Sequence, residues 1–127
     1  MLNRTGIKKE TLAGPVQILF NVQNQMSVGI RVSNAYSVTR DGRKIVPAGT
    51  PLSGSLEARN TAFVKAVDST NPAAGVLLHD VDVTDGEANG TLLIWGFVDL
   101  NKVDTATAAL ITTTRKTELA GKVTFLK

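Results

Sequence analysis

The chain has no cysteine, which excludes disulfide bonds, thiolate metal sites and cysteine nucleophiles together. Aromatic residues make up only 5% of its 127 residues, and there is a single histidine, His79. One histidine allows one catalytic triad at most, and no serine lies in the G-x-S-x-G sequence that presents a nucleophile. No glycine-rich phosphate-binding sequence occurs either. We therefore expect a protein that is not an enzyme and has no cofactor.

Long hydrophobic runs and a strong charge of one sign are also missing. The longest apolar run, Leu92 to Val98, is far shorter than the roughly 20 residues that a membrane-spanning helix needs. Fourteen basic against eleven acidic residues give a formal net charge of only +3, and the basic residues are scattered. With so few aromatics, no basic and aromatic platform is available for single-stranded nucleic acid. We expect neither a membrane nor a nucleic acid as a partner.

Length and composition predict one globular domain, because a chain of this size builds one core. The first dozen residues, polar and glycine-bearing, predict a flexible arm over residues 1–12 and a single β-rich domain over residues 13–127. Gly14, Pro15 and Gln17 interrupt the apolar stretch that a secretory signal would need, so we expect synthesis in the cytoplasm.

Apolar and polar residues alternate through the first two-thirds of the chain, which is typical of strands. Residues 18–22 and 28–33 have this pattern, and Asp41-Gly42 predicts a hairpin turn because glycine tolerates positive φ. Pro47 and Pro51 each lack a backbone donor, which predicts an edge or crossing segment around them. Further strands are expected over residues 62–67, 76–83 and 91–98.

After residue 103 the pattern changes to that of short helices. Asp104 and residues 112–114 are candidate N-caps, and Gly121 stands where a helix would end. Val123 and Phe125 then alternate with polar residues as a final strand. The sequence therefore predicts a mainly β fold: a small β-sandwich or barrel-like domain with one or two short C-terminal helices.

Asp80, Asp82 and Asp85, followed by glycine, have some of the spacing of a calcium-binding loop. The third acid stands one residue late, however, and Thr91 takes the place of the closing glutamate. In one continuous strand, the first two acids would share one face and His79 would lie on the other. Metal ligands would then diverge, and the histidine would lack a carboxylate to orient it as a base. We expect a polar strand face and an acidic turn, and no metal.

Residues 92–98, LLIWGFV, are apolar on both faces of the predicted strand, with Leu92, Ile94 and Val98 on one face and Leu93, Trp95 and Phe97 on the other. A small β domain rarely covers both faces of a strand by itself. Either a second sheet or a helix covers the far face, or another subunit does. Since tryptophan and phenylalanine are favoured at interface centres, Trp95 and Phe97 are candidate interface residues.

Several pieces of the chain recur in order and spacing in one family. They are GTPL at residues 49–52, AGVL at residues 74–77, DVDVT at residues 80–84, Gly96-Phe97 with Trp95 before them, and the closing TTTRKTELAGKVTFLK. In these pieces the chain resembles the head decoration proteins of tailed bacteriophages and of prophages of Gram-positive bacteria. The resemblance covers roughly residues 45 to 127 and depends on structural residues.

The resemblance implies a non-enzymatic viral structural protein. Members of that family form homotrimers that bind the outside of the expanded capsid near its threefold axes, where they hold major capsid protein subunits together. The expected location is thus the capsid surface of a virion, after synthesis in the cytoplasm of the bacterial host. In that family an N-terminal segment often adds a strand to a capsid sheet, which residues 10–20 would suit. Further candidate subunit or capsid interface residues are therefore Leu12, Val16, Ile18 and Phe20.

Two alternatives to capsid decoration stay open. The chain could be another virion component, such as a head fibre or a tail subunit. From a different class, it could be a small calcium- or carbohydrate-binding β module that uses the acids at residues 80–85.

Overall fold

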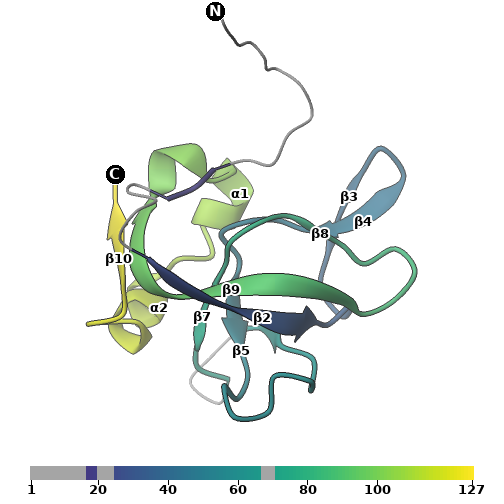
Figure 1. Ribbon diagram of the computed structural model, residues 1–127. Coiled ribbons are helices and arrows are strands. Elements are labelled where there is room, and N and C mark those ends of the chain that lie inside the picture. The colour runs from purple at the N-terminus through teal and green to yellow at the C-terminus, as the bar shows by residue number, and fades with distance from the viewer. Residues whose placement is uncertain (1–16, 20–24, 67–70) are drawn as a thin grey trace, which may run out of the picture.

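The structure is a computed structural model that describes residues 17–19, 25–66 and 71–127 (Figure 1). Its strands are β2 (Met26–Val32), β3 (Val38–Arg40), β4 (Arg43–Val46), β5 (Pro51–Ser53), β6 (Val64–Lys65), β7 (Gly75–Leu77), β8 (Val81–Asp82), β9 (Ala88–Asp99) and β10 (Val123–Leu126). Two short helices, α1 (Thr105–Ala108) and α2 (Thr113–Glu118), lie near the C-terminus. The predicted mainly β class with short C-terminal helices is confirmed. The predicted arm over residues 1–12 lies outside the described residues.

The larger sheet is built around β9, the long green strand across the middle of Figure 1. β2 pairs antiparallel with one edge of β9, and β7 pairs antiparallel with it at Leu92 and Leu93. β5 and β6 extend the sheet beyond β7, while β10 runs parallel to the last residues of β9. The other five strands of this sheet therefore depend, directly or through β7, on one strand of twelve residues.

A second, three-stranded sheet contains β3, β4 and β8. Asp41 and Gly42 connect β3 to β4 with φ angles of 51° and 78°, so both central residues of the turn are left-handed. Such a turn matches the twist of two antiparallel strands, and the predicted hairpin is confirmed.

Two hydrophobic clusters lie on opposite faces of the larger sheet. One cluster fills the space between the two sheets and contains Phe63, Leu77 and Leu92, all fully buried. The other contains Val76, Leu93, Val98 and Leu119 and lies between the larger sheet and the helical C-terminal region. The alternation of successive residues of β7 between these clusters is the pattern of a strand buried on both faces.

The helices are short, and side chains connect them to the body of the protein. Thr112 is the N-cap of α2, as predicted, because its hydroxyl accepts a hydrogen bond from the Arg115 amide at 3.4 Å. Arg115 is itself almost fully buried: its guanidinium lies 3.3 Å from the Glu118 carboxylate and donates to the carbonyl of Asn71. Glu118 accepts a hydrogen bond from the Ala73 amide at 2.8 Å. Through these hydrogen bonds to Asn71 and Ala73, the two members of the ion pair join α2 to the segment that leads into β7.

Two predicted strands differ from the structure. Residues 76–83 are not one strand: the chain leaves the larger sheet after Leu77 and joins the smaller sheet as β8. Of the two alternatives for the segment around Pro47 and Pro51, the edge is wrong, since β5 lies between β7 and β6. The crossing is confirmed, because residues 47–50 lead from β4 in the smaller sheet to β5 in the larger one. Proline is tolerated there because Pro51 is the first residue of the strand, the position where a missing donor disturbs the ladder least.

Among the described residues, no helix is both long and apolar enough to cross a membrane.

Candidate interaction surface

The C-terminal half of β9 departs from the regular alternation of a strand. Met26 of β2 lies opposite Trp95, and Ser27 lies opposite Leu93, so Ile94 has no partner in β2. Such a bulge places one extra residue in a strand and shifts which residues share a face. Leu93 and Val98 consequently pack in the same cluster although five positions separate them. The predicted division, with Val98 on the face of Leu92, is wrong for this reason.

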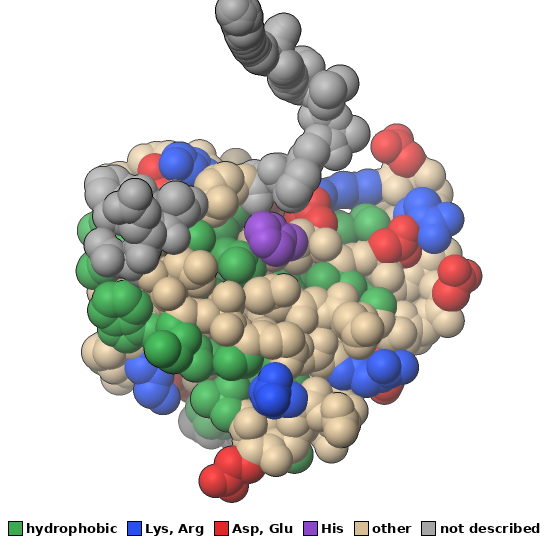
Figure 2. Space-filling model, in the orientation of Figure 1, with side chains coloured by type: hydrophobic (Ala, Val, Ile, Leu, Met, Phe, Trp, Pro, Cys, Tyr) green, Lys and Arg blue, Asp and Glu red, His purple; other side chains and the backbone are tan. Residues whose placement is uncertain are grey.

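The bulge leaves the two large aromatic side chains of β9 on the face opposite Val98. Trp95 is 45% exposed and Phe97 is half-buried, and their rings meet edge to face with centroids 6.0 Å apart. Met26, directly across from Trp95, is 59% exposed. We call Met26, Trp95 and Phe97 the apolar patch. Hydrophobic side chains gather at the left of Figure 2, where the N-terminal end of β2 and β10 lie in the view of Figure 1.

The other predicted interface residues lie elsewhere. Ile18 is fully buried in the cluster beneath the helices, and its carbonyl accepts a hydrogen bond from the Asp99 amide. Its side chain is therefore part of the core of the protomer. Leu12, Val16 and Phe20 are outside the described residues. Met26 was not predictable as part of this surface, because the register that sets it against Trp95 includes the unpaired Ile94.

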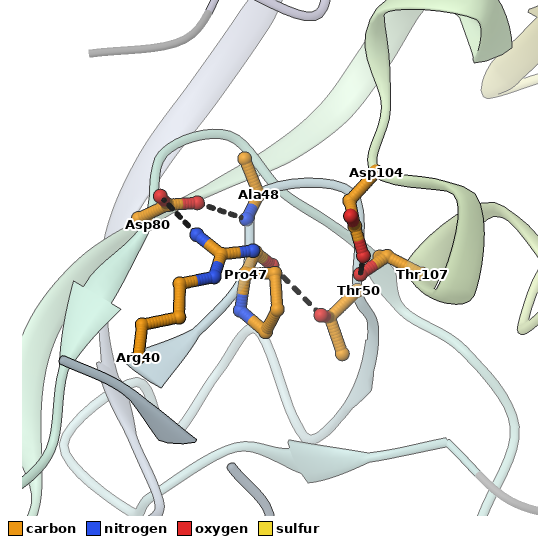
Figure 3. Close-up of polar contacts among 7 residues, drawn as sticks. All are labelled: Arg40, Pro47, Ala48, Thr50, Asp80, Asp104 and Thr107. Carbon is orange, nitrogen blue, oxygen red and sulfur yellow. Dashed lines mark hydrogen bonds and ion pairs between the residues drawn. The ribbon is translucent and has the colours of Figure 1, made fainter. Parts of the chain in front are cut away.

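Asp80 lies at the crossing between the two sheets, where Figure 3 shows its contacts. One carboxylate oxygen accepts from Arg40 at 3.0 Å, and the other accepts from the backbone amide of Ala48 at 2.7 Å. The adjoining cleft, of about 370 Å³, is also lined by Lys102 and Asp104. Because both of its oxygens already have donors, Asp80 connects the β3–β4 hairpin to the crossing as a structural group.

Asp82, two residues further along the chain, is held in a similar way. Its carboxylate pairs with the Arg43 guanidinium and accepts a hydrogen bond from the Thr84 amide at 2.9 Å. The hydrogen bond from Arg43, with those from Thr84, holds the pKa of the Asp82 carboxyl well below its usual range. The two acids are thus bound separately by arginines, and the described residues contain no cluster of three or more groups suited to a metal ion.

His79 is also at the crossing, where the strand that was expected to carry it is interrupted. Its Nδ1 atom is buried and has no hydrogen-bond partner within the described part of the chain. The neighbouring Asp80 carboxylate is occupied by Arg40 and Ala48 and does not orient the ring. Within the described residues, the geometry therefore offers His79 no carboxylate partner for acid–base chemistry.

The comparisons with known proteins add nothing to this geometry. No protein-family model matches the chain, and no curated protein matches it.

The Arg43–Asp82 pair predicts a lowered pKa for the Asp82 carboxyl. We expect the Asp82 carboxyl to titrate below the value of about 3.9 that is ordinary for aspartate, because its charged form holds hydrogen bonds from Arg43 and Thr84. A folded-state pKa below the unfolded one means that the contribution to stability is present above about pH 4 and is lost as the pH falls. Carboxyl carbon chemical shifts, followed by NMR against pH, give the midpoint.

Two variants control that titration. Arg43→Gln should raise the Asp82 midpoint towards the ordinary value, whereas Lys44→Gln, at the next and equally exposed base of β4, should leave it unchanged. An Asp82 midpoint at the ordinary value in the unaltered chain would show that the pair does not form in solution.

Proposed function

We propose that this chain is a non-enzymatic structural protein of a tailed-phage virion, which assembles as a trimer and binds the outer surface of the expanded capsid. The observation that carries the proposal is the apolar patch, where three large side chains lie together at the surface of one protomer. Contiguous exposed apolar surface of this kind marks interaction sites in soluble proteins. The identity of the partner, the capsid, is supported by the sequence resemblance alone.

The position of the patch favours assembly over a pocket for a small ligand. Trp95 and Phe97 lie on an extended strand of the main sheet, with Met26 on the neighbouring strand, so the three side chains project from one sheet face. A sheet face suits a broad contact with another protein, while small-molecule sites are concave. Tryptophan at such a centre is among the residues whose loss weakens association most.

The test of the proposal is a charge placed in the patch. We expect the unaltered chain to have the mass of a trimer, either in solution by light scattering or on heads of the phage that encodes it. Trp95→Arg should weaken the binding of the chain to expanded heads by at least about 30-fold, since loss of a central tryptophan typically costs 2 kcal/mol or more. Sedimentation with purified expanded heads measures the binding.

Val64→Arg is the matched control, because Val64 is also exposed but lies on β6, away from the patch. It should leave mass and binding unchanged. A strictly monomeric chain that does not bind expanded heads would rule out the proposal, and binding to isolated tails in place of heads would favour a tail component.

A further inference from the structure

The outer edge of β2 is only partly covered. The backbone N–H and C=O of Arg31 point away from β9 and bind Arg59 and Phe63 of the segment after β5, at 3.3 and 2.8 Å. Because backbone groups alternate in direction along a strand, Ser27 and Gly29 also direct theirs away from β9. The edge is thus covered at Arg31, and its second half runs from Gly29 back to Ser27.

In the described part of the chain, this second half has one hydrogen bond. Arg59 donates from its guanidinium to the Gly29 carbonyl at 2.9 Å, while the Ser27 and Gly29 amides have no acceptor from outside the strand ladder. Gly29 is exposed, and a side chain built on it would meet nothing within 4 Å. In Figure 1, β2 is drawn in front of β9. The two amides therefore form a free edge of the kind to which another strand can add.

A cleft of about 750 Å³ adjoins the same edge. Residues 29–31 of β2, the loop over residues 56–61, and Asn89 and Gly90 line it. Arg59 has no carboxylate partner among the described residues, whereas Arg31 pairs with the exposed Glu87 at 3.2 Å. Figure 2 shows basic side chains below the middle of this face. A guanidinium that has no carboxylate partner, beside a strand edge, suits a segment that carries a carboxylate.

We propose that the edge of β2 accepts an extended segment of the capsid shell protein, which adds a strand at Ser27 and Gly29 and places an acidic side chain against Arg59. This inference rests on the proposed function. Met26 precedes Ser27 in the same strand, so the edge and the apolar patch form one continuous surface. Main-chain hydrogen bonds would give affinity, and the arginine and the patch would select the side chains.

The charges argue against the two occupants that this chain itself could supply. Two copies of β2 paired edge to edge would bring Arg31 and Arg59 of one copy towards the same residues of the other, which like charges disfavour. Residues 1–16 contain three basic residues against one acid, Glu10, and so do not complement Arg59. An acidic segment of a different protein is the occupant that fits.

A purely structural role for Arg59 predicts a different behaviour. Charged side chains on an edge strand prevent unwanted pairing between copies. If that were the whole role, Arg59→Ala would bind heads normally and would self-associate more. If the edge accepts a shell segment, Arg59→Ala binds heads more weakly and its mass in solution is unchanged.

The direct test is hydrogen exchange of the chain, free and bound to expanded heads, read from peptides that span residues 26–32. We expect exchange of the Ser27 and Gly29 amides to slow by at least tenfold on binding. Arg59→Glu should weaken binding by at least tenfold, Arg59→Lys by less, and Lys44→Glu, at an exposed base of β4 in the smaller sheet, not at all. Normal binding with unchanged exchange at Ser27 and Gly29 would overturn the inference and leave the proposed function standing. Absence of binding by the unaltered chain would overturn both.

Discussion

Arg115→Ala should lower the free energy of unfolding by about 3–5 kcal/mol, the cost typical of removing one partner of a buried ion pair. The side chains of Arg115 and Glu118 are only 4% and 14% exposed, so water replaces the lost partner of the carboxylate poorly. Loss of the arginine also removes the hydrogen bond to Asn71, and with it part of the connection between α2 and the segment before β7. Urea unfolding followed by tryptophan fluorescence measures the change.

A double-mutant cycle separates this pair from simple loss of packing. Arg115→Met combined with Glu118→Gln should cost clearly less than the sum of the two single changes, because neither then leaves a buried charge without its partner. Additive costs, or a loss below about 1 kcal/mol for Arg115→Ala, would place the pair with the exposed ion pairs that contribute little.

Phe63→Ala should lower the free energy of unfolding by a similar amount, about 3–5 kcal/mol, because the change leaves a cavity in a fully buried site. Phe63 belongs to the cluster between the two sheets, and its ring lies so close to Gly54 that a Cβ there would approach it to 2.6 Å. Its backbone also binds Arg31 and Ser33 at the edge of β2. The residue therefore fills the core and also holds the backbone of Arg31, which lines the cleft.

Phe63→Leu is the control, since it keeps most of the apolar volume. It should cost much less than the alanine variant, and both should leave the Trp95 patch unchanged in the folded protein. Equal losses for the two variants would mean that the shape of the ring, and not the volume that it fills, determines stability at this position.

Local sequence signals predicted the parts of the fold that local chemistry determines. The Asp41-Gly42 turn was predictable because few residues tolerate two consecutive positive φ angles. The start of α2 was predictable because Thr112 can accept the hydrogen bond from the first turn. The closing strand, β10, was predictable because the apolar Val123 and Phe125 alternate with the polar Lys122 and Thr124.

Features set by contacts between distant residues were not predictable in this way. The predicted strand over residues 76–83 contains nothing that requires a break, yet its two ends join different sheets, because β5 and β9 pair with one end and β4 with the other. The pairing of Asp80 and Asp82 with separate arginines of the β3–β4 hairpin depends on the same break. Only the partners, which lie about 40 positions away in the chain, determine the outcome.

The interaction surface was predictable in kind but not in detail. An aromatic pair in a strand with two apolar faces indicated that one part of β9 needs a partner beyond its own sheet. Which face that pair occupies depends on one unpaired residue, and the side chain that completes the patch comes from β2. Burial of Ile18 likewise depends on where the C-terminal region packs.

The unpaired Ile94 has a consequence for how this strand can change in evolution. From Trp95 to Val98, exposed or half-exposed positions alternate with buried ones as in a regular strand that follows directly on Leu93. A chain lacking Ile94 would therefore keep the tryptophan at the surface, whereas a chain that kept Ile94 but lost the bulge would turn it inward. We expect homologues to tolerate a one-residue deletion here, and an alignment made by hydrophobic pattern to need a gap opposite Ile94.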